Sequence, residues 1–115
     1  MGKQISVIII GGLGLVGKEL TKELVKREYK VTVADIKKQP TEFRNKENFK
    51  YIKTNINNKN SLENLIKNSE KKFGKIDAVI NCSFPKNKKY GKKVLEVRYK
   101  DFTQNVNMHL GGFFL

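Results

Sequence analysis

Glycines near the N-terminus are the residues of this sequence with the clearest chemical use. They lie in the stretch QISVIIIGGLGLVGKELTKEL as Gly11, Gly12, Gly14 and Gly17. Glycine tolerates positive φ, which permits a sharp turn, and its lack of a Cβ lets the backbone approach a ligand closely. When such a turn opens a helix, the free N–H groups and the helix dipole favour phosphate. The cluster therefore predicts a site for a phosphorylated ligand.

The residues on either side predict a strand before the glycines and a helix after them. Ser6 to Ile10 is apolar and rich in β-branched residues, as in a strand buried on both faces. Val16, Leu20 and Leu24 recur at a spacing that places them on one face of a helix. Strand, glycine turn and helix in this order are typical of a dinucleotide site.

An acidic residue follows the next expected strand, Tyr29 to Ala34. This residue, Asp35, lies where an acid binds the hydroxyls of adenosine ribose. The spacing of Gly11, Gly14 and Gly17 differs from the G-x-G-x-x-G fingerprint at its first interval. Gly12, Gly14 and Gly17 match the fingerprint as written. The alternative is a glycine-rich turn without a ligand, which the strand, helix and acid together disfavour.

The same acid predicts which dinucleotide binds. Asp35 would repel a 2′-phosphate and accept hydrogen bonds from the ribose diol, which favours NAD. Lys37 and Lys38 are close enough in sequence to blunt that repulsion, so NADP is the alternative.

Composition narrows the class of protein. The 115 residues suffice for one domain, and the net charge is +13, from 24 Lys and Arg against 11 Asp and Glu. A basic chain could bind nucleic acid, but the excess is mostly Lys spread along the chain among many Asn, which is more typical of solvation. Cys82 is the one cysteine, which favours a reducing compartment and therefore the cytoplasm. The N-terminal apolar run is too short to span a membrane.

The middle of the chain predicts further alternation of strands and helices. A polar loop is expected over residues 36–48, with at most a short helix around 41–46, and then a strand over 48–54. Ser61 is a candidate N-cap for a helix that Gly74 ends. The apolar face of that helix comprises Leu62, Leu65, Ile66, Ser69 and Phe73.

The last third predicts one more strand and one more helix. Ala78 to Cys82 is apolar throughout, which favours a central strand. A basic loop follows over residues 83–93. Phe102, Val106, Leu110 and Phe113 then mark a long helix running to the last residue.

This alternation predicts an α/β fold. Parallel strands with right-handed crossovers give a doubly wound, Rossmann-like sheet in the order 3-2-1-4. The ligand crevice is then expected between the C-terminal ends of strands 1 and 4.

From Ser6 to the end, the sequence resembles the short-chain dehydrogenases/reductases. Four segments carry the resemblance in order: IIIGGLGLVGKEL, VTVADI, FGKIDAVINC and DFTQNVNMHLGGFFL. The run from Asn81 to the end is similar to members assigned to bacterial flagellin modification and surface-sugar synthesis. The resemblance implies an NAD(P)-dependent oxidoreductase that acts on a small molecule, with a sugar or activated sugar as the narrower expectation. It also implies a homo-oligomer for a full-length enzyme.

The resemblance assigns a set of cofactor-binding residues. Asp35 would bind ribose, and Asn55 falls where the family usually has an Asp that contacts adenine. Asn81 matches the first Asn of the family's Asn-Asn-Ala-Gly element, which this chain continues differently. The full set is Gly11, Gly12, Leu13, Gly14, Leu15, Val16, Gly17, Asp35, Ile36, Asn55, Ile56, Asn81, Cys82 and Ser83. No metal site is expected.

His109 occupies the position of the family's catalytic Asn, counted without gaps from the Phe-Leu pair near the end. An imidazole could hold a water in the family's proton relay, since it can both donate and accept. The alternative is a histidine that merely caps or packs. For Cys82 we favour a small buried side chain over a redox role.

The family's Tyr-x-x-x-Lys pair is absent from these residues. The residues four positions after the tyrosines are Val33, Asn55, Val94 and Thr103. The sequence therefore predicts the front part of a longer enzyme, inactive alone and prone to self-associate along its last strand. A non-catalytic dinucleotide-binding module is the runner-up, and a basic nucleic-acid-binding domain is the third alternative.

Overall fold

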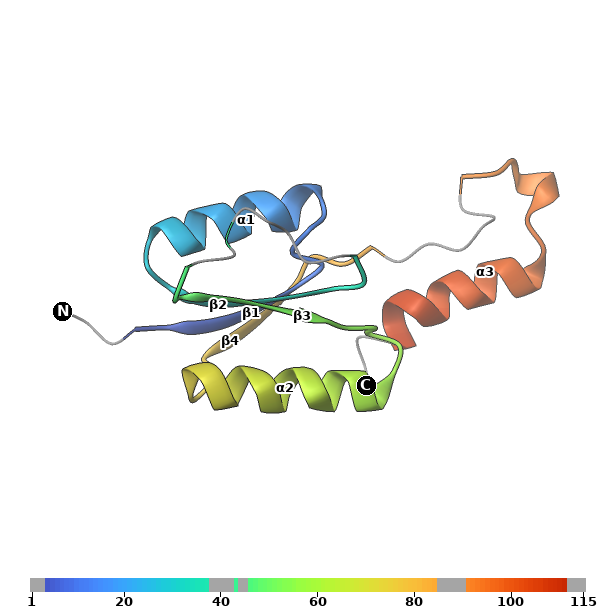
Figure 1. The fold of residues 1–115 in the computed structure, drawn as a ribbon. Coiled ribbons are helices and arrows are strands. Elements are labelled where there is room, and N and C mark those ends of the chain that lie inside the picture. The colour runs from blue at the N-terminus through green and yellow to red at the C-terminus, as the bar shows by residue number, and fades with distance from the viewer. Residues whose placement is uncertain (1–3, 38–42, 44–45, 85–90, 112–115) are drawn as a thin grey trace.

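The protein is a parallel sheet with one helix on each face (Figure 1). The computed structural model describes residues 4–37, 43, 46–84 and 91–111. The elements of the sheet and its two covering helices follow in chain order as β1 (Ser6–Ile10), α1 (Leu15–Lys26), β2 (Lys30–Asp35), β3 (Phe49–Lys53), α2 (Lys59–Phe73) and β4 (Ala78–Asn81). The expected loop helix around residues 41–46 lies largely outside the described residues.

The strand order is β3-β2-β1-β4, and every neighbouring pair is parallel. The predicted order 3-2-1-4 is thereby confirmed. In the register, Ile10 lies beside Ala34 on one side and Asn81 on the other. The C-terminal ends of the strands consequently meet at one edge of the sheet, where the glycine turn also lies.

The core has two halves, one on each face of the sheet. Side chains alternate along β1, so Val7 and Ile9 pack with Val25 of α1 while Ile8 packs with Leu65 of α2. In α1 the buried residues are Gly17, Thr21 and Val25. Val16, which the spacing placed on the buried face, is 72% exposed. The face of α1 that packs on the sheet is thus the one that carries Gly17 and Thr21, because Gly17 allows the closest approach.

Helix α2 begins before the residue expected to cap it. Asn58 is the N-cap, and its Oδ1 accepts a hydrogen bond of 3.0 Å from the Ser61 backbone N–H. The prediction of Ser61 as N-cap was wrong because Asn58 offers a similar side-chain acceptor one turn earlier. Gly74 ends the helix with φ of 76°, as predicted. Of the predicted apolar face, Ile66 is exposed.

Strand β4 forms one edge of the described sheet, paired only with β1 among the described strands. Its apolar composition favoured a central, buried strand, and that expectation was wrong for the described sheet. Val79 is 57% exposed because neither α1 nor α2 covers this side.

The last described segment lies beside the sheet rather than on it (Figure 1). A 3₁₀ turn, Val94–Glu96, precedes α3 (Tyr99–Val106), which continues as a π-helical turn, Asn107–Gly111. Phe102 and Leu110, expected on a buried face, are exposed, and Phe113 lies outside the described residues. No helix in the described ranges is long and apolar enough to cross a membrane.

Candidate dinucleotide site

Gly11 is the point where the chain turns out of β1. Its φ is +76°, and its N–H donates to the Ala34 carbonyl at 2.7 Å. A Cβ built at Gly11 would lie 2.6 Å from the Ser83 backbone nitrogen. Only glycine therefore satisfies both the turn and the approach of the loop that follows β4.

Gly17 and Gly12 are required for packing. A Cβ at Gly17 would lie 2.2 Å from the Gly11 carbonyl oxygen, so a side chain there would push α1 off the turn. A Cβ at Gly12 would lie 2.6 Å from Cγ1 of Val33. The second glycine of the cluster therefore serves the contact between the turn and β2.

Gly14 differs from the other three because its missing side chain leaves open space. A Cβ there would meet the Gly11 carbonyl oxygen at 3.4 Å, which is ordinary contact. Gly14 is also the N-cap of α1 and supplies no side-chain hydrogen bond to the first turn. The N–H groups of Leu15, Val16 and Gly17 therefore receive no side-chain cap from Gly14, and the helix dipole at this end favours negative charge.

Asp35 ties the end of β2 to the glycine turn. Its Oδ2 accepts a hydrogen bond of 3.0 Å from the Leu13 N–H. Its Oδ1 accepts from the Ile36 and Lys37 N–H groups at 2.7 and 3.2 Å. The carboxylate is thereby fixed beside the glycine turn, and its oxygens have further lone pairs that could accept hydrogen bonds.

Tyr51 of the neighbouring strand bonds the backbone around Asp35, and the sequence analysis missed this residue. Its hydroxyl donates to the carbonyl oxygens of Asp35, at 3.2 Å, and Lys37. Partial burial and then the negative charge of Asp35 raise the pKa of Tyr51, so its proton is retained. A tyrosine near the end of a strand expected beside the Asp35 strand was the available signal.

Asn55 and Ile56 follow β3 at the same edge. The Asn55 Oδ1 accepts a hydrogen bond of 2.9 Å from the Asn57 N–H. The backbone N–H of Asn55 donates to the Ser61 Oγ at 2.9 Å. The amide oxygen of Asn55 thus shapes the turn into α2, while its side-chain NH₂ group can donate to a ligand. Ile56 is half-buried and Ile36 is exposed, which offers apolar surface beside Asp35.

The last residue of β4, Asn81, and the two residues after it lie beside the glycine turn. Asn81 Oδ1 accepts hydrogen bonds from the Ser83 N–H, at 2.9 Å, and its hydroxyl, at 2.6 Å. The Cys82 N–H donates to the Ile10 carbonyl at 2.7 Å, and its side chain packs against the core. These bonds hold the Ser83 backbone against Gly11. The packing of Cys82 agrees with a small apolar role.

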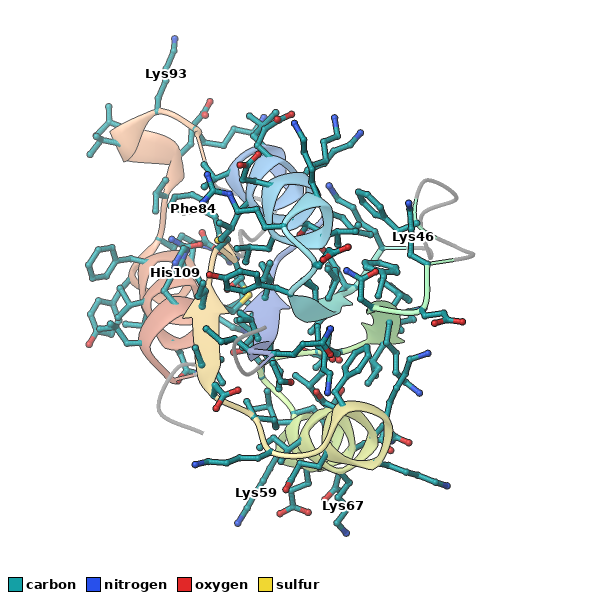
Figure 2. The ribbon with its side chains drawn as sticks, turned by 90° about the vertical axis from the view of Figure 1, so that its left-hand side faces the viewer. Lys46, Lys59, Lys67, Phe84, Lys93 and His109 are labelled. Atoms are coloured by element: carbon teal, nitrogen blue, oxygen red, sulfur yellow. The ribbon has the colours of Figure 1, made fainter. Side chains whose placement is uncertain are left out.

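His109 contacts Phe84, the residue that follows Ser83. Its ring meets that of Phe84 edge to face, with centroids 4.7 Å apart and planes at 74° (Figure 2). His109 is half-buried on the π-helical turn, and Phe84 is exposed. Phe84 was not predicted as a site residue because only the fold brings it to His109. The described residues contain no group of three or more His, Cys, Asp or Glu able to hold a metal ion.

The lysines labelled in Figure 2 point in different directions from the fold. Lys59 and Lys67 project from α2, whereas Lys46 and Lys93 project from other sides. These four side chains do not form one basic surface of the kind that nucleic acid requires.

Sequence and structure comparisons give the same assignment. Residues 6–115 match the family described as short chain dehydrogenase. A curated relative, "Post-translational flagellin modification protein A" of Campylobacter coli, is 32% identical over 95% of this chain and 46% of its own length. The chain therefore spans about half the length of that relative.

Solved structures share the fold at lower identity. A short chain dehydrogenase from Leptospira borgpetersenii with bound NAD+ gives a TM-score of 0.80 at 23% identity, over 97% of this chain and 42% of that one. A structure of ElxO with NADP bound gives 0.75 at 21% identity, over 97% of this chain and 47% of that one. With the parallel sheet, the glycine turn and the family match together, the chain belongs to the short-chain dehydrogenase/reductase family.

Proposed function

We propose that this chain is the NAD(P)-binding part of a short-chain oxidoreductase, with residues 1–115 forming one cofactor domain. The observation that carries the proposal is the hydrogen bond from the Leu13 N–H to Asp35 Oδ2. The support is that this bond holds the carboxylate, proposed to bind ribose, beside the helix N-terminus proposed to bind phosphate. Ribose hydroxyls and phosphate are the groups that the adenosine half of a dinucleotide carries.

The cofactor is proposed to be NAD, with NADP as the alternative. Asp35 accepts hydrogen bonds from a ribose diol and repels a 2′-phosphate. Relatives of this fold hold either cofactor, as the NAD+ and NADP complexes above illustrate. When bound, the dinucleotide supplies hydride exchange with a substrate.

The residues divide between the two ends of the ligand. Gly14, Leu15, Val16 and Gly17 offer backbone to the pyrophosphate, and Asp35 binds the adenosine ribose. Ile36, Asn55 and Ile56 border the adenine side. Asn81, Cys82 and Ser83 border the nicotinamide side, where His109 is proposed to hold a proton or a water for the reaction.

For the whole enzyme we propose a cytoplasmic homo-oligomer that acts on a sugar or an activated sugar. The support is the similarity to a flagellin modification protein. A non-catalytic dinucleotide-binding module is the second candidate, because these residues lack the Tyr-x-x-x-Lys pair that the family uses for proton transfer.

Calorimetric titration of the chain with NAD+, NADP+ and AMP tests the proposal. We expect NAD+ to bind more tightly than NADP+, and Asp35→Ala to weaken NAD+ binding. The matched control is Glu19→Ala, which removes an exposed carboxylate of α1 whose partner is Lys22. Absence of dinucleotide binding, or equal loss in both variants, would contradict the proposed site.

A further inference from the structure

Phe84 and His109 come from segments far apart in sequence and meet beside the end of β4. Their ring centroids are 4.7 Å apart and their planes are inclined by 74° (Figure 2). Edge-to-face pairs of this kind are favourable and have a defined geometry. The contact therefore restricts where the imidazole lies.

The strand order places this pair at a particular end of the ligand. Asp35 ends β2 and Phe84 follows β4, and these strands flank β1 on opposite sides. A dinucleotide with its adenosine ribose on Asp35 crosses the N-terminus of α1 and continues toward β4. Its nicotinamide then lies on the side of Phe84 and His109.

The chain holds Phe84 in place through the loop before it. Asn81 Oδ1 accepts two hydrogen bonds from Ser83, and the Ser83 backbone approaches Gly11 so closely that a Cβ would not fit. Phe84 therefore follows a segment that is fixed to the glycine turn. Phe84 as a residue is 60% exposed, so the pair remains accessible to a ligand.

We propose that Phe84 is a positioning residue that directs the His109 imidazole toward the nicotinamide end of the bound dinucleotide. His109 lies on a π-helical turn, a structure frequent at functional sites, and its nitrogens can donate to and accept from a polar group there. Phe84 acts through His109 and does not itself exchange a proton. The inference rests on the proposed function, since it requires that a dinucleotide binds.

His109 is the one histidine of the sequence, so its imidazole gives unambiguous proton NMR signals. Signals are recorded for the free chain and for the chain saturated with NAD+ or with ADP-ribose, which lacks the nicotinamide. We expect NAD+ to move the His109 signal further than ADP-ribose does. Phe84→Leu should move the free signal, through loss of the ring current, and remove the difference between the ligands, while Phe84→Tyr should preserve both.

Phe102→Leu is the matched control, because Phe102 is 61% exposed and Phe84 is 60% exposed. It should leave the His109 signal and both ligand responses as in the unmodified chain. The inference is overturned if Phe84→Leu leaves the free signal unchanged, or if NAD+ and ADP-ribose move the signal equally while calorimetry shows that both bind. If calorimetry shows that neither binds, the proposed function fails and the inference with it.

Discussion

The backbone N–H of Leu13 lies 3.0 Å from Oδ2 of Asp35, and this hydrogen bond joins the glycine turn to the end of β2. One carboxylate thus shapes the turn, and in the proposed function it also accepts hydrogen bonds from ribose hydroxyls. Substitution can remove its charge while keeping one of its two acceptor oxygens.

Asp35→Asn keeps an acceptor oxygen and removes the charge, whereas Asp35→Ala removes both. We expect both variants to raise the NADP+/NAD+ affinity ratio about tenfold, since about 1.4 kcal/mol of repulsion and hydrogen bonding is lost. Both variants should also lower thermal stability, Asp35→Ala by more, because Asn keeps an acceptor at only one of the two positions that backbone N–H groups use. Titration of both cofactors into both variants, with melting curves, measures this, and an unchanged ratio would exclude Asp35 as the discriminator.

Glycine substitutions should separate packing from ligand approach. Gly17→Ala should destabilise the fold by about 1–3 kcal/mol, because its Cβ would overlap the Gly11 carbonyl oxygen. Gly14→Ala should cost less than about 1 kcal/mol, since its Cβ meets ordinary contact, yet weaken NAD+ binding about tenfold. Urea unfolding and calorimetry on the two variants make the comparison. Equal destabilisation by both substitutions would contradict these separate roles.

The strand order was predictable because each strand is a short β-branched or apolar run, and helical patterns separate β1 from β2 and β3 from β4. Whether other segments cover β4 could not be predicted, since the residues Ala78 to Asn81 do not specify what packs on them. The spacing of the glycines also assigned Gly12 to the cofactor fingerprint. Its contact with Val33 depends on how β2 lies against β1, which local sequence does not specify.

The α2 start and the Phe84 contact show two further limits. Asn58 and Ser61 are both good N-caps, and the choice between them depends on where the chain leaves β3. Phe84 and His109 are brought together by tertiary structure alone. Local sequence preferences were therefore enough to predict the strands and the glycine turn. They were not enough to predict the contact between Phe84 and His109, which depends on long-range packing.

Thr32 and Ser69 form a buried hydroxyl pair between β2 and α2, with oxygens 2.8 Å apart. Replacing one hydroxyl leaves the other without its partner, so Thr32→Val and Ser69→Ala should each cost about 1–3 kcal/mol. The double variant should cost less than the sum of the two. A double-mutant cycle by urea unfolding tests this. Additive losses would show that the pair is not coupled.

Stability should fall at high pH because of Tyr51. Partial burial and then Asp35 raise the pKa of Tyr51 above its ordinary value of 10.0. Its protonated form therefore contributes stability that is present below about pH 10 and is lost as pH rises through the raised pKa. Tyr51→Phe should lessen this decline, whereas Tyr99→Phe, at an exposed site, should not. Urea unfolding across that pH range, with absorbance titration of the tyrosines, measures it; identical profiles for both variants would contradict the role.

The 115-residue chain alone should bind a dinucleotide and yet form no NADH from sugars. It lacks the Tyr-x-x-x-Lys pair, and acid–base help of that kind typically contributes about a hundred- to ten-thousandfold to the rate. Absorbance assays with NAD+ and a panel of sugars test the expectation. Substrate-dependent NADH formation by this chain would overturn it.

The bonds of the glycine turn have a consequence for the kinetics of ligand capture. Hydrogen bonds within the protein fix this turn: the Gly11 N–H donates to the Ala34 carbonyl, the Gly14 N–H to the Gly11 carbonyl and the Leu13 N–H to Asp35. Because these bonds join protein atoms alone, we expect that a dinucleotide need not form them when it binds. Association should therefore proceed in a single phase without a preceding loop-ordering step, and differences in affinity among the glycine and Asp35 variants should arise chiefly from the dissociation rate.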